Sequence, residues 1–324
     1  MYTPPFDLTP KILSISLNIQ ELLGELKDTT LVKPSVLLRK KNKIKTIHSS
    51  LAIEGNDLSE AQITALIDKK RVAGSQKQIK EVQNALKLYD DLHLFNAFNE
   101  KDLLKSHAIL MDGLVDAPGK YRSSNVGIFK GSKVGHVAPQ AKLVPALMKD
   151  LFVFLKTKDG IPFLIKACIF HYELEFIHPF EDGNGRMGRL WQQLLLMKHS
   201  PLFEYLSVES LIHKEQKKYY RVLEVCDKAG DSNAFIEFSL ELIFLVLKEF
   251  KDEYRSPKLS GFDRVKMALE AFNDNSFTRK EYMALYKDIS TATASRDLSS
   301  AVEEGVLKRF GDKALAKYVI SKKK

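Results

Sequence analysis

The sequence contains little cysteine, a single tryptophan and no long apolar run. Its two cysteines, Cys168 and Cys226, both fall in apolar helical patterns, which argues against a disulfide framework and predicts a reducing compartment. No stretch approaches the ~18 consecutive apolar residues of a membrane span. The first residues, MYTPPFDLTPKIL, lack a basic segment followed by an apolar core. We therefore expect a cytoplasmic protein with no membrane partner.

The composition is that of a folded protein. The 324 residues are 44% hydrophobic and 28% charged with both signs interspersed, which predicts two or three globular units. The formal net charge of +9 favours polyanionic partners such as nucleic acid or nucleotide phosphates.

Helical periodicity dominates most of the chain. Apolar residues recur three or four positions apart in LSISLNIQELLGEL, EVQNALKLYDDLHLFNAF, LVPALMKDLFVFL, PFLIKACIFHYELEFIH and AFIEFSLELIFLVLKEF. This spacing predicts a mainly α fold. One exception is VGIFKGSKVGHVAP, residues 126–139, where alternating apolar residues on both sides of KGSK predict a short β-hairpin.

The C-terminal part of the sequence differs in kind. EYRSPKLSG, residues 253–261, is polar and contains a proline and a glycine, which is typical of a linker. After it come three helical segments, DRVKMALEAF, RKEYMALY and ATASRDLSSAVEE, and two strand-like runs, VLKRF and AKYVI. This order predicts a winged helix-turn-helix. The chain is thus expected to contain an N-terminal helical region, a central core and a C-terminal module, residues 1–98, 99–255 and 260–324.

The stretch HPFEDGNGRMGR, from His178 to Arg189, has the local pattern of a phosphate site. Pro179 cannot continue the preceding helix, so His178 is expected at its end. A Gly-Asn-Gly turn then leads into RMGRLWQQLLL, which resumes helical spacing. A glycine-rich turn before a helix directs unpaired backbone N–H groups and the positive end of the helix dipole at one point.

The side chains around this turn suit phosphate transfer. Arg186 and Arg189 lie three apart in the first helical turn and can bind more than one phosphate. Asp182 offers the hard oxygen ligand that Mg²⁺ uses when it is shared with nucleotide phosphates. His178 can accept a proton from an attacking hydroxyl, because imidazole titrates near neutral pH.

HPFEDGNGRMGR matches the HPFx[DE]GNGRxxR signature of the Fic (filamentation induced by cyclic AMP) family at every fixed position. The resemblance covers most of residues 50–250. It implies a Fic-type helical core with a hairpin flap, and transfer of AMP from ATP to a Ser, Thr or Tyr hydroxyl of a target protein or of the chain itself. The cofactors implied are ATP and Mg²⁺.

The resemblance also implies roles for the first half of the signature. His178 would deprotonate the target hydroxyl, and Asp182 would hold Mg²⁺ between the α- and β-phosphates. Asn184, with the backbone amides of Gly183 and Gly185, would bind the α-phosphate where charge builds in the transition state.

In the second half, Arg186 would hold the β-phosphate and Arg189 the γ-phosphate. Met187 and Gly188 belong to the same nucleotide-binding stretch, and Phe180 is expected to be a packing residue.

Outside the signature, a downstream tyrosine often lines the adenine pocket in this family. Tyr220 of KKYYRVL is the first candidate and Tyr219 the second, with helix packing as the alternative for both. The hairpin from Ile128 to Val137 resembles the flap that aligns an extended target segment by main-chain pairing. Lys133 and His136 in the hairpin are either target contacts or solvated turn residues.

A second carboxylate lies far upstream. In SSLAIEGN, Ser50 and Glu54 are four apart at the end of a helix that Gly55 is expected to stop, and Ser59 opens the next helix with a capping box. Ser50-x-x-x-Glu54-Gly55 matches the family's inhibitory motif [ST]xxxE[GN]. That resemblance implies that Glu54 pairs with Arg189 and denies it to the γ-phosphate. The same carboxylate could orient a water for removing AMP.

Other interpretations remain open at this stage. His171, Glu175 and His178 share helical spacing and are a weak candidate for a metal site, with His171 more at home in the core. The C-terminal module could bind DNA through Ser295 and Arg296, or serve docking or dimerisation.

Two other functions compete with the main prediction. The protein could be a DNA-binding regulator whose core senses nucleotide, or a family member that transfers UMP, phosphate or phosphocholine. A homodimer is common among similar proteins and could set the position of the inhibitory helix.

Overall fold

The computed structural model describes residues 3–29, 36–130, 133–254, 260–272, 275–286, 289–311 and 316–321. Its contacts divide the chain into two compact units, residues 1–252 and 253–324. Most of the predicted linker lies outside the described residues; the helix before it continues to Tyr254, and the helix after it begins at Gly261. The predicted division between residues 98 and 99 falls inside the larger unit.

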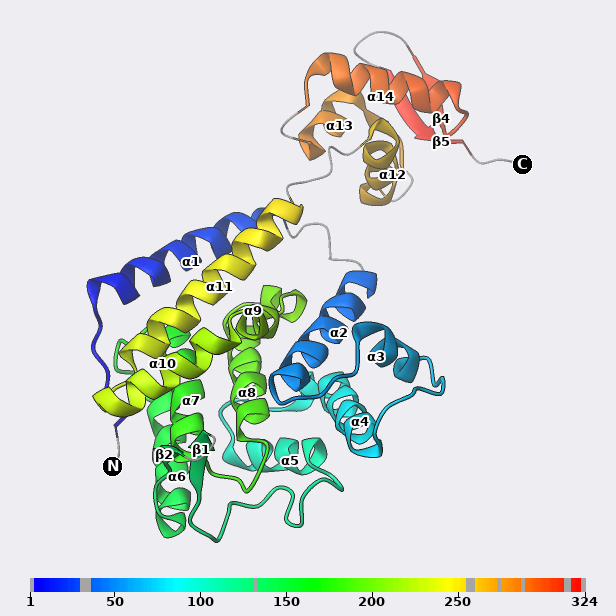
Figure 1. Ribbon diagram of the computed structural model, residues 1–324. Helices are drawn as coiled ribbons and strands as arrows, with labels where there is room; N and C mark the ends of the chain where they lie inside the picture. The colour runs from blue at the N-terminus through cyan, green and yellow to red at the C-terminus, as the bar shows by residue number, and fades with distance from the viewer. Residues whose placement is uncertain are drawn as a thin grey trace. The chain divides into compact units, whose positions relative to one another are not determined.

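The larger unit consists of helices and one hairpin (Figure 1). Its elements, with short 3₁₀ helices labelled η, are α1 (Pro10–Thr29), α2 (Val36–Ile53), α3 (Glu60–Ile67), α4 (Gln76–Asp90), η1 (Leu92–Leu94), α5 (Glu100–Leu110), β1 (Gly127–Lys130), β2 (Lys133–Val137), η2 (Ala141–Leu143), α6 (Val144–Lys156), α7 (Phe163–Ile177), α8 (Asn184–His199), η3 (Pro201–Tyr205), α9 (Val208–Lys214), α10 (Gln216–Ala229) and α11 (Asn233–Tyr254). The predicted mainly α fold is confirmed. Within the described ranges, no helix has both the length and the apolar character needed to cross a membrane.

Helices α7 and α8 form the centre of this unit. Twelve of the 15 residues of α7 and twelve of the 16 residues of α8 are buried, which is the pattern of helices surrounded by other elements. The two helices pack against each other and are joined by residues 178–183. Trp191 of α8 is fully buried and donates from Nε1 to the Ala97 carbonyl at 3.0 Å. The HPFEDGNGRMGR stretch therefore lies at the junction of two deeply buried helices.

Helices α1 and α11 lie side by side and run parallel (Figure 1, blue and yellow). Lys11 pairs with Glu237 at 2.7 Å near the start of both helices, and Lys251 pairs with Glu25 near their ends. These ion pairs join the first helix of the larger unit to its last helix.

Strands β1 and β2 form the predicted hairpin. They are antiparallel, with Gly127 opposite Val137 and a bulge between Ile128 and Phe129. Among the described residues the hairpin is a sheet of its own, so no third strand pairs with it there. The side chains of Lys133 and His136 lie outside the described part of the structure, and their roles stay predictions.

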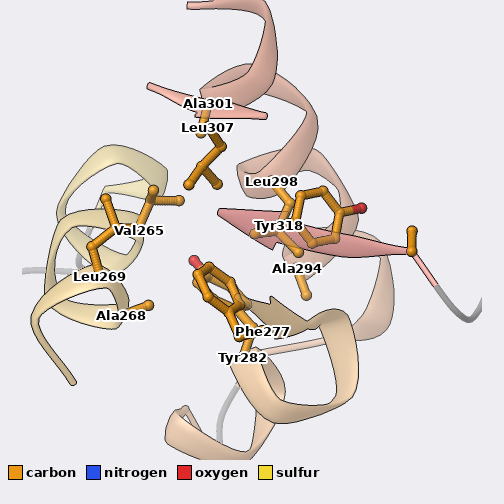
Figure 2. Close-up of a cluster of buried hydrophobic side chains, with 11 residues drawn as sticks. Val265, Ala268, Leu269, Phe277, Tyr282, Ala294, Leu298, Ala301, Leu307 and Tyr318 are labelled. Carbon is orange, nitrogen blue, oxygen red and sulfur yellow. The ribbon is translucent and has the colours of Figure 1, made fainter. Parts of the chain in front are cut away.

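The smaller unit combines three helices with a three-stranded antiparallel sheet of order β3–β5–β4. Its elements are α12 (Gly261–Ala271), β3 (Phe277–Thr278), α13 (Arg279–Leu285), α14 (Thr291–Glu303), β4 (Leu307–Phe310) and β5 (Lys317–Ile320). Figure 2 shows that Val265, Tyr282, Leu298 and Leu307, from all three helices and the sheet, point into one shared core. Strand β3 is not among the predicted elements, because two residues are too few to show an alternating pattern.

A buried carboxylate joins the three helices of this unit. Asp297 of α14 is 6% exposed. It accepts hydrogen bonds from Arg264 Nε of α12 at 2.6 Å and from the Tyr282 hydroxyl of α13 at 3.0 Å. Removing a carboxylate in this position leaves a largely buried guanidinium without its charged partner.

Replacing Asp297 with alanine should destabilise the smaller unit by about 2–4 kcal/mol. Hydrogen exchange followed by mass spectrometry should show faster exchange across residues 260–321 and no change in α7 and α8. Glu303→Ala removes an exposed carboxylate from the same helix and is the matched control. Equal exchange in the two variants would contradict the prediction.

Candidate active site

The loop between α7 and α8 depends on two residues with left-handed backbone. Helix α7 ends at Ile177, and His178 follows with φ 51° while its N–H still donates to the Leu174 carbonyl at 3.0 Å. Gly183 precedes α8 with φ 86°, and a Cβ there would lie 2.8 Å from the sulfur of Met111. Backbone angle and space therefore both exclude a side chain at Gly183.

Asn184 and Phe180 hold the inside of the loop. The Asn184 Oδ1 accepts from the Phe180 N–H, and its Nδ2 donates to the Phe180 carbonyl, both at 2.9 Å. Phe180 is fully buried, as predicted, and its ring stacks on His107 with centroids 3.7 Å apart. Because both polar atoms of the Asn184 amide have partners inside the loop, its contact with phosphate stays a prediction.

His107 of α5 holds the outer part of the loop. Its Nδ1 accepts from the Gly119 N–H at 2.8 Å, which leaves Nε2 to donate to the Asp182 carbonyl at 3.0 Å. Burial lowers the pKa of His107 to about 4, so the ring is neutral at physiological pH and keeps this donor direction. The Asp182 backbone is thus fixed, while its carboxylate is 50% exposed.

Arg189 is the buried cation of the site, with a side chain only 1% exposed. Its Nε donates to the Ser50 hydroxyl at 3.1 Å, and its Nη2 donates to the Ser50 carbonyl at 3.0 Å and to Glu54 Oε1 at 2.7 Å. Burial alone would lower the pKa of Arg189, but the Glu54 charge helps to hold it above its ordinary value. The structure therefore contains the Glu54–Arg189 pair that the sequence resemblance implies.

Gly185 provides the space for this ion pair. A Cβ at Gly185 would lie 2.6 Å from Glu54 Oε1 and 3.1 Å from Arg189 Nη1. The Glu54 carboxylate consequently lies against the first turn of α8, where backbone N–H groups lack intrahelical acceptors and no side chain caps the helix. Anions are stabilised at such a terminus, so Glu54 lies where an anionic ligand would bind.

The end of α2 is held in place from α10. The Ile53 carbonyl accepts from Gln216 Nε2 at 3.0 Å and from the Tyr220 hydroxyl at 3.3 Å, and Gly55 follows with φ 87°. Tyr219 is fully buried, whereas Tyr220 is only partly buried. Tyr220 is thus the more accessible of the two, although its contact with adenine stays a prediction.

Arg186 has a different set of partners. It is 5% exposed, with Nη1 3.3 Å from Glu81 of α4 and Nη2 3.1 Å from Asp182. Glu81 also accepts a hydrogen bond at 2.8 Å from Nδ2 of Asn56, which lies two residues after Glu54 in the sequence. Both arginines are therefore linked to the segment at the end of α2.

Met187 and Gly188 contribute packing. Met187 is fully buried, and a Cβ at Gly188 would lie 2.8 Å from the ring of His171. Gly188 thus allows α8 to approach α7 closely. Their contact with nucleotide stays a prediction.

A largely buried carboxyl group, with 13% of its side chain exposed, lies close to the ion pair. Glu175 of α7 accepts from the Tyr219 hydroxyl at 3.2 Å, and this hydroxyl lies 3.2 Å from His171 Nε2. Burial raises the pKa of Glu175 to about 7, although the charge of Arg189 lowers it. Within the described residues, no three His, Cys, Asp or Glu side chains gather as a metal centre would require. His171 and Glu175 instead belong to a hydrogen-bonded network in the core.

Three residues of the site are not among the predicted ones: Glu81, His107 and Arg122. Arg122 donates from Nε to the His178 carbonyl at 2.7 Å. None of the three belongs to a motif, and their contacts with Arg186, Asp182 and His178 span 105, 75 and 56 positions of the sequence. The one local signal that could have pointed to any of them is that Arg122, in YRSSNVG, has no acidic neighbour in the sequence.

The sequence matches a known family. The model of the Fic/DOC family matches residues 97–196, from just before α5 through most of α8. Protein adenylyltransferase Fic from Aedes aegypti is 34% identical over 208 residues, which are 60% of this chain and 39% of that protein. The protein of the same name from Culex quinquefasciatus is 33% identical over 210 residues, with the same shares. The chain thus spans about two fifths of the length of the curated relatives it matches.

Solved structures show the same relationship. Fic-1 (residues 134–508) from C. elegans is 21% identical with a TM-score of 0.57 over 75% of this chain and 74% of that chain, a similarity of fold. A Fic family protein from Desulfovibrio desulfuricans is 38% identical with a TM-score of 0.74, covering 100% of this chain and 99% of that chain. Since this identity extends over nearly the whole of both chains, the protein belongs to the Fic/DOC family.

Proposed function

We propose that the protein is an auto-inhibited protein adenylyltransferase that transfers AMP from ATP to a serine, threonine or tyrosine hydroxyl of a target protein or of the chain itself. The observation that carries the proposal is the occupied anion site: Glu54 lies between Arg189 and the glycine-rich first turn of α8. Relatives named protein adenylyltransferase support this reaction. ATP as the donor agrees with the cytoplasmic location expected from the sequence.

His178 is proposed as the base. Its Nδ1 lies 3.4 Å from the Glu175 carbonyl, a long hydrogen bond that favours a proton on Nδ1, so that Nε2 accepts the proton of the hydroxyl. The hydroxyl oxygen forms a bond to the α-phosphorus, and the bond from the α-phosphorus to pyrophosphate breaks. Adenylylated protein and pyrophosphate are the products.

The start of α8 is proposed to bind the phosphates. The backbone N–H of Gly185 and its neighbours in the first turn would stabilise the α-phosphate oxygens as charge builds on them. Arg186 and Arg189 would bind the β- and γ-phosphates through their forked donors. The Gly183 N–H already donates to Asp182 Oδ1 at 2.6 Å, so its part is to orient that carboxylate.

Asp182 fits a role as the protein ligand of Mg²⁺. Its carboxylate is half exposed, and the hydrogen bonds from Gly183 and Arg186 both go to Oδ1. Oδ2 would therefore be the oxygen that holds the ion, and a single carboxylate is what Mg²⁺ commonly takes from protein at such sites. When bound, the ion would neutralise charge on the leaving pyrophosphate.

Glu54 is proposed to inhibit by occupying the γ-phosphate site. Loss of its carboxylate removes one of three hydrogen bonds to Arg189 but leaves the two to Ser50, so the guanidinium should stay in place and become available to phosphate. The carboxylate–guanidinium bond is worth about 1.5–3 kcal/mol in such a pocket, or roughly tenfold to a hundredfold in activity.

Glu54→Gly should raise incorporation of label from α-labelled ATP into protein by about tenfold to a hundredfold in the presence of Mg²⁺ and cell lysate. Glu54→Gly/His178→Ala should abolish it, because the base is lost. Glu60→Ala, which removes an exposed carboxylate six positions further on, is the matched control and should not change the labelling.

Parallel incubations separate this reaction from its alternatives. Label retained from γ-labelled ATP would indicate phosphate transfer, and label from α-labelled UTP would indicate UMP transfer; either result in place of α-label from ATP would exclude adenylylation. No increase for Glu54→Gly would exclude the inhibitory role.

Glu175 is proposed to remain protonated, so that Glu54 is the carboxylate that neutralises Arg189. The folded protein keeps the Glu175 proton up to about pH 7, whereas the ordinary value is 4.5. Between these values the folded state binds one more proton than the unfolded state. The contribution of Glu175 to the free energy of unfolding is therefore lost as the pH rises from about 4.5 to about 7.

In Glu175→Gln, the free energy of unfolding should decrease less over this pH interval than in the wild type, by on the order of 2 kcal/mol. Urea unfolding at pH 5 and pH 8, followed by fluorescence of the single tryptophan Trp191 in the adjoining helix, measures it. Other buried groups, including His107 and His171, are common to both proteins and cancel in the difference. Identical pH dependence in both would show that Glu175 is not protonated in the folded state.

A second candidate function, DNA binding, is favoured by exposed cations of the smaller unit. Its elements have the order of a winged helix-turn-helix, with α14 in the place of the recognition helix. Arg296 of α14, Lys308 and Arg309 of β4, and Lys317 of β5 are exposed. Ser295 is partly buried and accepts from Arg279 Nη1 at 2.9 Å, so Arg296 is the stronger candidate for a DNA contact. On this hypothesis the Fic core would sense nucleotide.

If the smaller unit binds DNA, the full chain should retard a mixed-sequence duplex in a gel shift, and its affinity should fall as salt is raised. Arg296→Ala should weaken binding severalfold and make it less sensitive to salt, whereas His178→Ala should not change it. Lys228→Ala, an exposed lysine of the larger unit, is the control. A wild type that does not bind the duplex at low salt would exclude this function.

A further inference from the structure

Arg122 is a buried arginine that the proposed reaction does not use. It lies between α5 and β1 and is 6% exposed. Within the described residues it has no carboxylate partner, and its side-chain hydrogen bonds all go to backbone carbonyls. A buried cation of this kind is retained only if its donors are well satisfied.

Two of these hydrogen bonds go to the segment that carries His178. Arg122 Nε donates to the His178 carbonyl at 2.7 Å, and Nη2 lies 3.3 Å from the Ile177 carbonyl. In addition, the backbone N–H of Arg122 donates to the Pro179 carbonyl at 2.9 Å. Three consecutive carbonyls, including that of the left-handed His178, are thus held by one residue.

The remaining hydrogen bonds go to the two ends of the hairpin. Nη1 donates to the Ser124 carbonyl at 2.9 Å, three residues before β1 begins. Nη2 donates to the Pro139 carbonyl at 2.5 Å, two residues after β2 ends. The guanidinium therefore connects both bases of the hairpin to the backbone of His178.

The planar geometry of the guanidinium explains why an arginine can do this. Its five N–H donors lie in one rigid plane, so four carbonyls bound to them are also fixed relative to one another. A displacement of the hairpin would leave donors of a buried cation unpaired unless the His178 segment moved with it. Burial lowers the pKa of Arg122 from its ordinary value, but an arginine remains charged and cannot avoid this cost by losing its proton.

We propose that Arg122 is a positioning residue that fixes His178 relative to the hairpin β1–β2, through carbonyls of both segments. This inference rests on the proposed function, in which His178 deprotonates the target hydroxyl, and on the expectation from the sequence that the hairpin aligns the target segment. A shared support for the two segments sets the distance between the aligned hydroxyl and the base. Nucleotide binding involves α8 and should not depend on it.

The test uses the full chain in the Glu54→Gly background with Arg122→Gln and Arg122→Lys. Self-labelling from α-labelled ATP is measured as a function of ATP concentration. For Arg122→Gln the rate at saturating ATP should fall at least tenfold, while the half-saturating ATP concentration changes less than twofold. Arg122→Lys keeps the charge but has a compact head that reaches fewer carbonyls, so its rate should be intermediate.

Hydrogen exchange supplies a readout that does not depend on activity. In Arg122→Gln, exchange should become faster in both residues 126–139 and residues 177–183, with α8 unchanged. Lys166→Gln is the control, because Lys166 is a buried cation of α7 that donates to the Phe154 and Thr157 carbonyls and also pairs with Asp159 at 2.8 Å. It should leave both segments and the labelling rate unchanged.

The outcomes separate the inference from the function on which it rests. If Glu54→Gly itself does not label protein, adenylylation is excluded, and hydrogen exchange still tests the connection. If Glu54→Gly labels and Arg122→Gln labels equally fast, or if exchange rises in the hairpin alone, the positioning role is excluded. If Arg122→Gln does not fold, Arg122→Lys is judged by the same two criteria.

Discussion

The buried charge of Arg189 is the constraint on which the site depends. A guanidinium removed from water costs several kcal/mol unless its donors are paired, and the end of α2 supplies the partners, Ser50 and Glu54. Helix α2 must therefore pack close to α8, and contacts that hold its end, such as those of Gln216 and Tyr220 with Ile53, become part of the site. In the proposed function, regulation and folding thus share one ion pair.

The loop that carries His178 is held in another way. Asn184 bonds to the Phe180 backbone, neutral His107 bonds to the Asp182 carbonyl, and Arg122 donates to backbone carbonyls. These hydrogen bonds join side chains to neutral backbone groups, so none of them uses a carboxylate that a phosphate ligand would replace. The cations that phosphate would need, Arg186 and Arg189, are by contrast the ones that carboxylates bind in this state. In the proposed function, the loop can therefore keep its shape while phosphate replaces Glu54 at Arg189.

Much of the architecture could be predicted from local sequence. The spacing of apolar residues predicted the helices around residues 163–199, and the capping box at Ser59 is confirmed. Alternating apolar residues on both sides of KGSK predicted the hairpin, although not the bulge between Ile128 and Phe129. Strand β3 was missed because Phe277 and Thr278 form a strand only by pairing with β5, about forty positions later. A motif also does not reveal that the Asn184 amide is bonded inside its own loop, and the contact of Asn184 with phosphate stays a prediction.

By itself, the sequence determined which groups can act on a phosphate and where helices stop beside them, because Pro179, Gly183 and the arginines of the first turn of α8 act over a few residues. Through the resemblance of SSLAIEGN to an inhibitory motif, it also indicated that Glu54 lies at Arg189, 135 positions away. Only the tertiary structure decided that Glu81 binds Arg186, that His107 fixes the Asp182 carbonyl and that Arg122 joins the hairpin to His178. The physical reason is that each of these contacts joins residues 56 to 105 positions apart in the sequence. A buried donor bonds to whichever acceptor the packing brings within reach, and local sequence does not specify that acceptor.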